Sequence, residues 1–311
     1  MVSAPILKPE FLKRLPVVPR GQWAEQYKFP SNYYPIEAGR AIHYLDVGSG
    51  PPVVMVHGNP GWSFMWRSLV SGLTGYRRLA LDLMGMGLSS RPGPGPWYSL
   101  SGRILDFSSW LDSLDLTEPI HLIVHDWGGP IALGWAANNP EKVASLTLMN
   151  TAVRLPHGAK ISNKLLLFKK TLFLGRLLCV NLNLFVRGLV RYGTVRPMTQ
   201  ATIEGLLAPY RTKDHREAVG AFIKDIPLSP SHPSYAALAN LDRNLSRLST
   251  KPTELIWGLK DFVFTPIFMR DLAERFKAPE LWGLKTSGHC LTEDQPGHIC
   301  DIVLDFLRRN S

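Results

Sequence analysis

The segment that most constrains the fold is residues 122–129, an apolar run that ends in an aspartate, a tryptophan and two glycines. A short apolar run bounded by glycine predicts a buried strand. The two glycines allow a sharp turn from that strand into a helix, which leaves the central side chain of the turn standing above the sheet. That central residue is Asp126. The sequence therefore predicts a strand, a tight turn and a helix, with Asp126 presented at the turn.

The identity of Asp126 limits the chemistry that the turn can support. A serine that attacked a saturated carbon would form an ether, which no later step could hydrolyse. An aspartate forms an ester, and water can attack the ester carbonyl and regenerate the enzyme. We therefore predict that Asp126 is a nucleophile for an alkyl carbon bearing a leaving group. The simpler interpretation, an N-cap for the following helix, does not explain Trp127 and the two glycines.

Short apolar strands alternate with helical patterns along most of the chain. Strands are predicted at residues 41–47, 53–57, 78–82, 121–125, 143–149, 253–257 and 280–285. Helices are predicted at residues 62–73, 100–114, 129–138, 267–276 and 299–309. This alternation predicts an α/β fold, with a mostly parallel central sheet flanked by helices on both faces.

The alternation stops after residue 151, where helical sequence punctuated by proline takes over, and it resumes at residue 253. We interpret residues 154–250 as a helical cap inserted into a core made of residues 1–153 and 251–311. Open parallel sheets carry their sites at the carboxyl ends of the strands. The cap is therefore expected to form a lid above Asp126.

The cap also carries the excess charge of the chain. The net charge is +10, and residues 154–250 contain 15 Lys and Arg against 5 Asp and Glu, an excess that equals the total. The most apolar stretch, residues 165–190, is interrupted by four cations, Lys169, Lys170, Arg176 and Arg187. A membrane span would not carry four cations at its middle. The segment is better interpreted as a basic amphipathic surface, which suits an anionic membrane, a multi-enzyme assembly with an acidic partner, or plain solvent.

Other features bear on the compartment and on cofactors. The three cysteines form no CxxC pair or disulfide framework, which favours a reducing compartment. The first ten residues lack the continuous apolar run of a secretory signal, so a cytoplasmic protein is expected. The glycine-containing loop at residues 82–89 lacks the GK[ST] of a phosphate-binding loop. No cofactor, metal ion or nucleic acid is expected.

Two residues downstream complete a candidate catalytic triad with Asp126. In this architecture the chain order is nucleophile, acid, histidine. His289 alone among the nine histidines lies in a glycine-containing turn after the last predicted strand, and we predict that it is the general base. Asp261 follows the strand at 253–257 and is predicted to orient His289. The strand before it ends in Met-Asn-Thr, at residues 149–151, and offers no carboxylate.

Asn59 and Trp127 are the predicted oxyanion and halide donors. Asn59 lies in an HGNP segment directly after an apolar strand. Its backbone N–H and that of Trp127 would face the carbonyl of esterified Asp126. Their side-chain amide and indole N–H groups would hold a departing anion, such as halide or carboxylate. His57 and His125 are interpreted as buried strand-end residues that shape this region.

These motifs together resemble the α/β-hydrolase superfamily and, within it, the haloalkane dehalogenases of the third subfamily. The resemblance covers the whole chain and rests on HGNP at 57–60, VHDWGG at 124–129, WGxxD at 257–261 and GH at 288–289. It implies that Asp126 displaces halide from a haloalkane, and that water activated by His289 then hydrolyses the alkyl ester. It leaves the pocket shape open at Cys290, where an aromatic residue is expected.

Four segments also resemble the bacterial β-lactone decarboxylases of long-chain olefin biosynthesis, namely FVRG at 185–188, LAPY at 207–210, DIPL at 225–228 and DFVF at 261–264. This resemblance implies a reaction with the same first step. The ring carboxylate of a cis-β-lactone is the leaving group, and loss of carbon dioxide then expels Asp126 and yields an alkene without water. Arg187 is a candidate contact for that carboxylate. Either substrate is small and hydrophobic.

Two alternatives remain open. An epoxide hydrolase uses the same nucleophile with lid tyrosines, and Tyr192, Tyr210 and Tyr235 are available. However, Asn59 stands where that family usually carries an aromatic residue. The other alternative is a non-catalytic binding protein of the same fold, which would have no need of three triad residues together.

Overall fold

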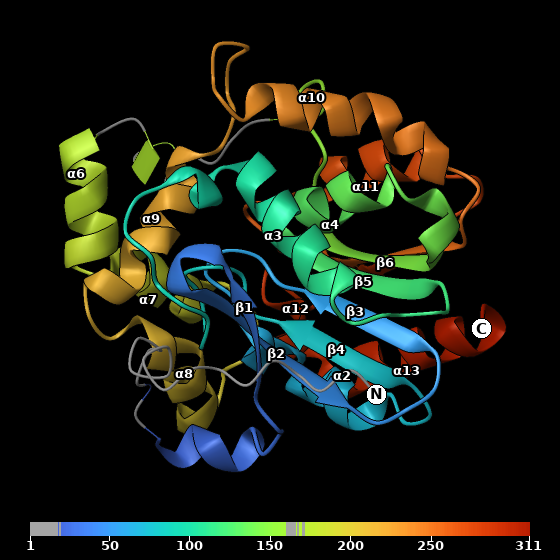
Figure 1. Ribbon diagram of the computed structural model, residues 1–311, viewed down its shortest axis with the longest axis horizontal. Helices are drawn as coiled ribbons and strands as arrows, with labels where there is room; N and C mark the ends of the chain where they lie inside the picture. The colour runs from blue at the N-terminus through green and yellow to red at the C-terminus, as the bar shows by residue number, and fades with distance from the viewer. Residues whose placement is uncertain (1–17, 19, 160–165, 167, 170–171) are drawn as a thin grey trace.

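The computed structural model describes residues 18, 20–159, 166, 168–169 and 172–311 (Figure 1). The amino-terminal ten residues and Lys170 lie outside this part of the chain. The described part forms a single sheet with helices on both faces, and the predicted α/β class is confirmed.

The sheet has eight strands in the order β1-β2-β4-β3-β5-β6-β7-β8. From β4 to β8 the neighbouring strands are parallel, whereas β2 is antiparallel to β4 and β1 is antiparallel to β2. The strands are β1 (Asn32–Ile36), β2 (Arg40–Val47), β3 (Pro52–Val56), β4 (Arg77–Leu81), β5 (Ile120–Asp126), β6 (Val143–Thr151), β7 (Thr253–Gly258) and β8 (Glu280–Leu284).

The edge strand β1 is absent from the sequence-based prediction. Each of its residues is half-buried, so it lacks the apolar alternation that marks the other strands. It also contains Pro35, which cannot donate to a strand neighbour and is tolerated at a sheet edge. An edge position without a buried face explains why the sequence pattern missed it.

The core helices cover both faces of the sheet. Figure 1 shows α3, α4 and α11 on one face and α2 and α13 on the other. The helices of the core are α2 (Arg67–Gly72), α3 (Leu100–Asp112), α4 (Gly128–Ala136), α11 (Pro266–Ala273), α12 (Leu291–Asp294) and α13 (Pro296–Arg309). Every residue of the central strands β3 and β5 is buried as a result, as expected for parallel strands packed on both sides.

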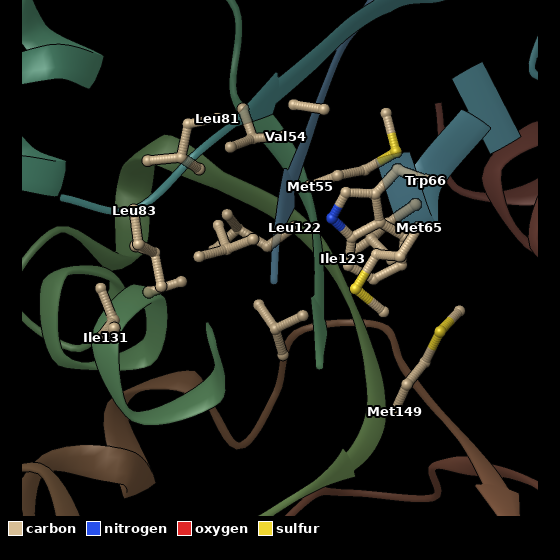
Figure 2. Close-up of a cluster of buried hydrophobic side chains, with 14 of the residues drawn as sticks. Val54, Met55, Met65, Trp66, Leu81, Leu83, Leu122, Ile123, Ile131 and Met149 are labelled. Atoms are coloured by element: carbon tan, nitrogen blue, oxygen red, sulfur yellow. The ribbon is translucent and has the colours of Figure 1, made fainter. Parts of the chain in front are cut away.

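Successive residues of β5 pack alternately against the two helical layers. Figure 2 shows Ile123 beside Met65 and Trp66, and Leu122 on the side of Leu83 and Ile131. All six are buried within one apolar cluster. This packing fixes the carboxyl end of β5, where Asp126 lies.

Helices joined by loops make up the described residues of the segment 154–250, and no strand is found in that part of it. They are α6 (Leu172–Arg176), a π-helical turn at Leu177–Asn181, α7 (Leu184–Tyr192), α8 (Gln200–Leu207), α9 (Glu217–Lys224) and α10 (Tyr235–Asn244). Figure 1 shows α6, α7, α8 and α9 gathered beyond one end of the sheet, whereas α10 lies on α3 and α4 of the core. Within the described residues, no helix is both long enough and apolar enough to cross a bilayer.

A buried ion pair joins α3 to the segment after α9. Arg103 is 1% exposed and donates to Asp225 at 3.0 Å, while its guanidinium lies 3.6 Å from the centroid of the Phe222 ring. Asp225 also accepts from Ser234 at 2.6 Å. Burial lowers the pKa of Arg103 to about 10, against the opposing effect of Asp225.

Asp225→Asn is expected to destabilise the protein because it leaves a buried guanidinium without its counter-charge. Breaking such a pair from one side costs about 3–5 kcal/mol. Chemical denaturation measures this loss. The double variant Arg103→Met/Asp225→Asn removes both charges and should recover most of it. An equal loss in the single and double variants would contradict a charge-based role for the pair.

Candidate active site

Asp126 lies at a strained turn between β5 and α4. Its φ of 51° is in the left-handed region, which side-chain-bearing residues rarely adopt. Two glycines make room for the turn. A Cβ at Gly128 would lie 2.0 Å from the carbonyl oxygen of Val56, and one at Gly58 would lie 2.1 Å from Asp126 Oδ1. The predicted strand–turn–helix is therefore present, and close backbone approach explains its glycines.

The two oxygens of the Asp126 carboxylate have different environments. Oδ1 accepts the backbone N–H of Asn59 at 2.7 Å and that of Trp127 at 2.6 Å. Oδ2 lies 3.8 Å from Nε2 of His289. Burial raises the pKa of Asp126, and His289 with the two N–H donors opposes that rise. The arrangement holds Oδ1 in a pair of backbone donors and leaves Oδ2 as the oxygen that can attack.

His289 and Asp261 form the second half of the predicted triad. His289 Nδ1 lies 2.8 Å from Asp261 Oδ2, and both side chains are almost fully buried. Burial alone would lower the pKa of His289, but the attraction of Asp261 outweighs it and the pKa is raised. For Asp261 burial would raise the pKa, yet His289 and the hydrogen-bond donors lower it. The structure thus brings Asp126, His289 and Asp261 together at the carboxyl edge of the sheet.

Asn150 is a member of this network that the sequence analysis missed. Asn150 lies at the carboxyl end of β6, beside β7. Its Nδ2 donates to Asp261 Oδ2 at 2.6 Å, and its Oδ1 accepts the N–H of Gly258 at 2.8 Å. Its φ is 35°, so its backbone is also in the left-handed region. A polar amide that ends an apolar strand was the available signal.

Asn150→Ala is expected to slow any step that depends on an oriented His289. A hydrogen bond to a charged group contributes about 1.5–3 kcal/mol, which corresponds to roughly 10- to 100-fold in rate. The single-turnover rate of bromoalkane hydrolysis, compared between the variant and wild type, measures the effect. Asn138→Ala, which removes an amide that donates to the Gly134 carbonyl on α4, is the matched control. Equal rates for wild type and Asn150→Ala would contradict the orienting role.

His57 and His125 are buried and structural, in agreement with their interpretation from sequence. The Leu83 N–H donates to His57 Nε2 at 2.9 Å, so Nδ1 carries the proton and donates to the Gly58 carbonyl at 2.7 Å. His125 Nε2 donates to the carbonyl of His289 at 2.9 Å. Burial lowers the pKa of both, to about 3 for His125, so both rings are neutral. They fix the backbone on either side of the triad.

Asn59 and Trp127, the predicted donor pair, both line a cavity beside Asp126. Asn59 is buried, and one of its amide hydrogens is directed to the Val219 carbonyl at 3.3 Å. An amide has a second hydrogen, which remains for a ligand. The Trp127 ring packs edge-on against Phe222 at 5.4 Å. The two side chains therefore stand next to the oxygen that would attack.

The cavity has a volume of about 400 Å³ and is lined by residues of both the core and the segment 154–250. Its walls are mainly apolar, including Phe168, Phe185, Leu189, Ile223, Leu238 and Phe264. A cavity of this size lies in the range of sites for ligands much larger than a short haloalkane.

Three expectations about the cavity need correction. Arg187 is exposed on α7 and does not line the cavity. Among the described residues, the cation in the lining is Arg154, which is paired with Asp271 at 2.6 Å. Of the three tyrosines, Tyr192 lines the cavity, whereas Tyr210 is buried with its hydroxyl donating to the Gly61 carbonyl at 2.9 Å. The third, Tyr235, is outside the lining.

Cys290 does not shape the cavity either. Its N–H donates to the Gly193 carbonyl at 2.8 Å, and a Cβ at Gly193 would lie 2.8 Å from its sulfur. The end of α7 leaves no space there for an aromatic ring. Among the described residues, no group of three His, Cys, Asp or Glu is arranged to hold a metal ion.

The chain is similar to known proteins over most of its length. Residues 51–296 match the family described as alpha/beta hydrolase fold. A cis-3-alkyl-4-alkyloxetan-2-one decarboxylase from Shewanella oneidensis is 36% identical over 273 residues, which cover 86% of each chain. One from Xanthomonas campestris is 33% identical over 293 residues, covering 91% of this chain and 98% of the relative. Haloalkane dehalogenase 2 from Mycobacterium tuberculosis is 31% identical over 288 residues, covering 90% and 95%.

Solved structures give the same picture of the fold. The haloalkane dehalogenase DatA from Agrobacterium tumefaciens superposes with a TM-score of 0.82 at 25% identity, covering 94% of this chain and all of the other. DbeA from Bradyrhizobium elkani superposes with a TM-score of 0.81 at 22% identity, covering 91% and 98%. At that identity the second match speaks for the fold alone.

Proposed function

The chain is an enzyme of the α/β hydrolase family and is related to an oxetan-2-one decarboxylase and a haloalkane dehalogenase, and we propose that Asp126 forms an alkyl ester with its substrate. One observation carries this proposal. Oδ1 of Asp126 accepts two backbone N–H groups, Oδ2 lies 3.8 Å from Nε2 of His289, and Asp126 lines the cavity. A carboxylate held in this way attacks through one defined oxygen.

In this proposal each site residue has one role. Asp126 is the nucleophile, His289 is the general base for water, and Asp261 orients His289. The backbone N–H groups of Asn59 and Trp127 stabilise the oxyanion that forms at Oδ1 during hydrolysis, and their side chains hold the departing anion. The segment 154–250 is the cap that closes over this site.

For the substrate we propose a cis-β-lactone with two alkyl chains. Oδ2 of Asp126 attacks the saturated ring carbon that is bonded to the ring oxygen. The bond between that carbon and the ring oxygen breaks, which gives a tethered carboxylate. The bond to that carboxylate then breaks, its electrons form the alkene, and Asp126 leaves with the electrons of its own bond to carbon. The products are an alkene and carbon dioxide. Support comes from the names and identities of two relatives and from the large apolar cavity.

Haloalkane dehalogenation is the second candidate, favoured by the pairing of Asn59 with Trp127 beside the nucleophile. Two neutral N–H donors suit a halide leaving group. Water activated by His289 would then hydrolyse the ester to an alcohol. An epoxide is the third candidate substrate and is less favoured, because Tyr192 alone of the three tyrosines lines the cavity and the Tyr210 hydroxyl is committed to the Gly61 carbonyl.

The test is to incubate the purified protein with a bromoalkane, an epoxide and a synthetic cis-β-lactone in parallel, and to measure bromide, diol and alkene. Alkene from the lactone at the highest rate is the expected result. Bromide without alkene would replace the lactone by the haloalkane as substrate. Turnover of none of the three would overturn the ester at Asp126.

The remaining expectations are part of the same proposal. We place the protein in the cytoplasm, in keeping with three cysteines that are all unpaired. The hydrophobic substrate, with halide for the second candidate, is the proposed small-molecule partner.

A further inference from the structure

Large apolar side chains are exposed around the mouth of the active-site cavity. Each of them lines the cavity and is also between 39% and 66% exposed. We call this set the apolar rim: Leu155, Leu184, Tyr192, Leu228 and Phe262. Its members come from four separate segments, which follow β6, form α7, follow α9 and follow β7. The fold therefore gathers exposed apolar side chains at one place.

Isolated exposed apolar residues are ordinary, because there is too little polar surface to cover a protein. A contiguous patch is different and marks an interaction surface. All members of the apolar rim border one cavity, so they are gathered around a single site. It therefore fits an apolar or amphipathic partner.

The surface beside the rim is cationic. Arg187 and Arg191 are exposed on α7, and their spacing of four residues places them on one stripe next to Leu184. Neither makes an ion pair with a carboxylate in the part of the chain that the structure describes. Lys224 and Lys260 are exposed in the segments that lead to Leu228 and Phe262.

Carboxylates near the rim do not balance these cations. Asp261 is buried in the triad, and Asp225 is buried against Arg103. Asp242 and Asp271 lie near the mouth, but they are paired with Arg154 and Arg275. The exposed charge around the rim is thus positive, in line with the surplus of 10 positive charges in residues 154–250.

We propose that the cavity mouth docks on an anionic phospholipid bilayer and receives its substrate from that bilayer. The apolar rim would enter the interface, and the cations beside it would meet the anionic headgroups. A folded protein on this surface would block the mouth, whereas a fluid bilayer both covers the rim and dissolves a long-chain substrate. Delivery of substrate rests on the proposed function, but docking itself does not.

Vesicle flotation without substrate tests the docking. The purified protein is mixed with vesicles of phosphatidylcholine alone, or of phosphatidylcholine with phosphatidylglycerol. Two double variants separate the contributions, Arg187→Gln/Arg191→Gln for charge and Leu184→Ser/Leu228→Ser for the rim. The control is Lys277→Gln/Arg308→Gln, which removes the same charge at the opposite edge of the sheet, before β8 and at the end of α13.

The expected result is binding to the anionic vesicles that weakens with added salt. Each basic residue near an anionic surface increases partitioning about fivefold, so loss of both arginines should reduce partitioning roughly 30-fold. Loss of the two leucines should reduce it at least about tenfold, and the control should bind like wild type. Equal binding to neutral and anionic vesicles, or no binding, would overturn the proposal. So would a dimer in solution that the leucine variant dissociates, since the rim would then belong to a second copy.

A turnover assay keeps this inference separate from the proposed function. Arg187→Gln/Arg191→Gln should turn over a short, water-soluble substrate at the wild-type rate, because neither arginine lines the cavity. The same variant should be slower on a long-chain substrate dissolved in anionic vesicles. Equal rates for variant and wild type on the vesicle substrate would refute delivery from the bilayer. Failure of every substrate with intact vesicle binding would instead refute the chemistry.

Discussion

Asp126→Asn is expected to lower turnover of every substrate by about 10⁴-fold or more, as found when a covalent nucleophile is removed from other hydrolases. An amide nitrogen or oxygen at the position of Oδ2 does not displace a leaving group from saturated carbon. Initial rates of bromide and alkene release measure the loss. Intact mass of the same sample must exclude deamidation back to aspartate. Asp301→Asn, on the exposed face of α13, is the control and should behave like wild type.

The same variant should not be less stable than wild type at neutral pH. Burial raises the pKa of Asp126 in the folded protein above its unfolded value. The folded state therefore favours the protonated form, and the contribution of this group to stability falls as pH rises through that interval. Asparagine removes the penalty and still offers an oxygen to the two N–H donors. Full turnover by Asp126→Asn, free of deamidation, would refute the carboxylate ester.

His289→Ala is expected to have the second large effect on turnover, and the effect should distinguish the two candidate reactions. With a bromoalkane, the first step still occurs but water is no longer activated, so hydrolysis should slow by about 10³-fold or more. Intact-mass measurement should then find the protein heavier by one alkyl group. With a cis-β-lactone, the elimination needs no water, and alkene should form at a rate within about tenfold of wild type. His298→Ala, exposed on α13, is the control.

The pH dependence of the rate should also distinguish hydrolysis from alkene formation. Hydrolysis requires neutral His289, whose pKa is raised by Asp261. Its rate should therefore increase as pH passes upward through that raised pKa and level off above it. Alkene formation does not use this proton acceptor, so its rate should not increase with pH in this way.

An unmodified protein after release of bromide by His289→Ala would count against an ester hydrolysed by this histidine.

The sequence supports the fold well because the central strands are buried on both faces. Each predicted strand lies within two residues of an observed one, from β2 at Arg40–Val47 to β8 at Glu280–Leu284. β1 was missed because an edge strand without a buried face leaves no apolar pattern.

The candidate site was predictable where a residue follows a strand in a recognisable turn, as Asp126, Asp261 and His289 do. Asn150 was not found, because its partner Asp261 is 111 residues away and the pairing depends on β6 lying beside β7. The link between Arg103 and Asp225 spans 122 residues and leaves no local signal for the same reason. Arg187 was misplaced because a sequence does not say which side of α7 faces the cavity.

The unequal environments of the two Asp126 oxygens have an isotopic consequence. In heavy-oxygen water, the alcohol from a first hydrolytic cycle should carry Oδ2 of the protein and no solvent label, because the alkyl–oxygen bond is never broken. The solvent atom stays behind in Asp126 and reaches the alcohol only in the following cycle. Elimination to an alkene breaks that alkyl–oxygen bond instead, so the protein should finish each cycle unlabelled.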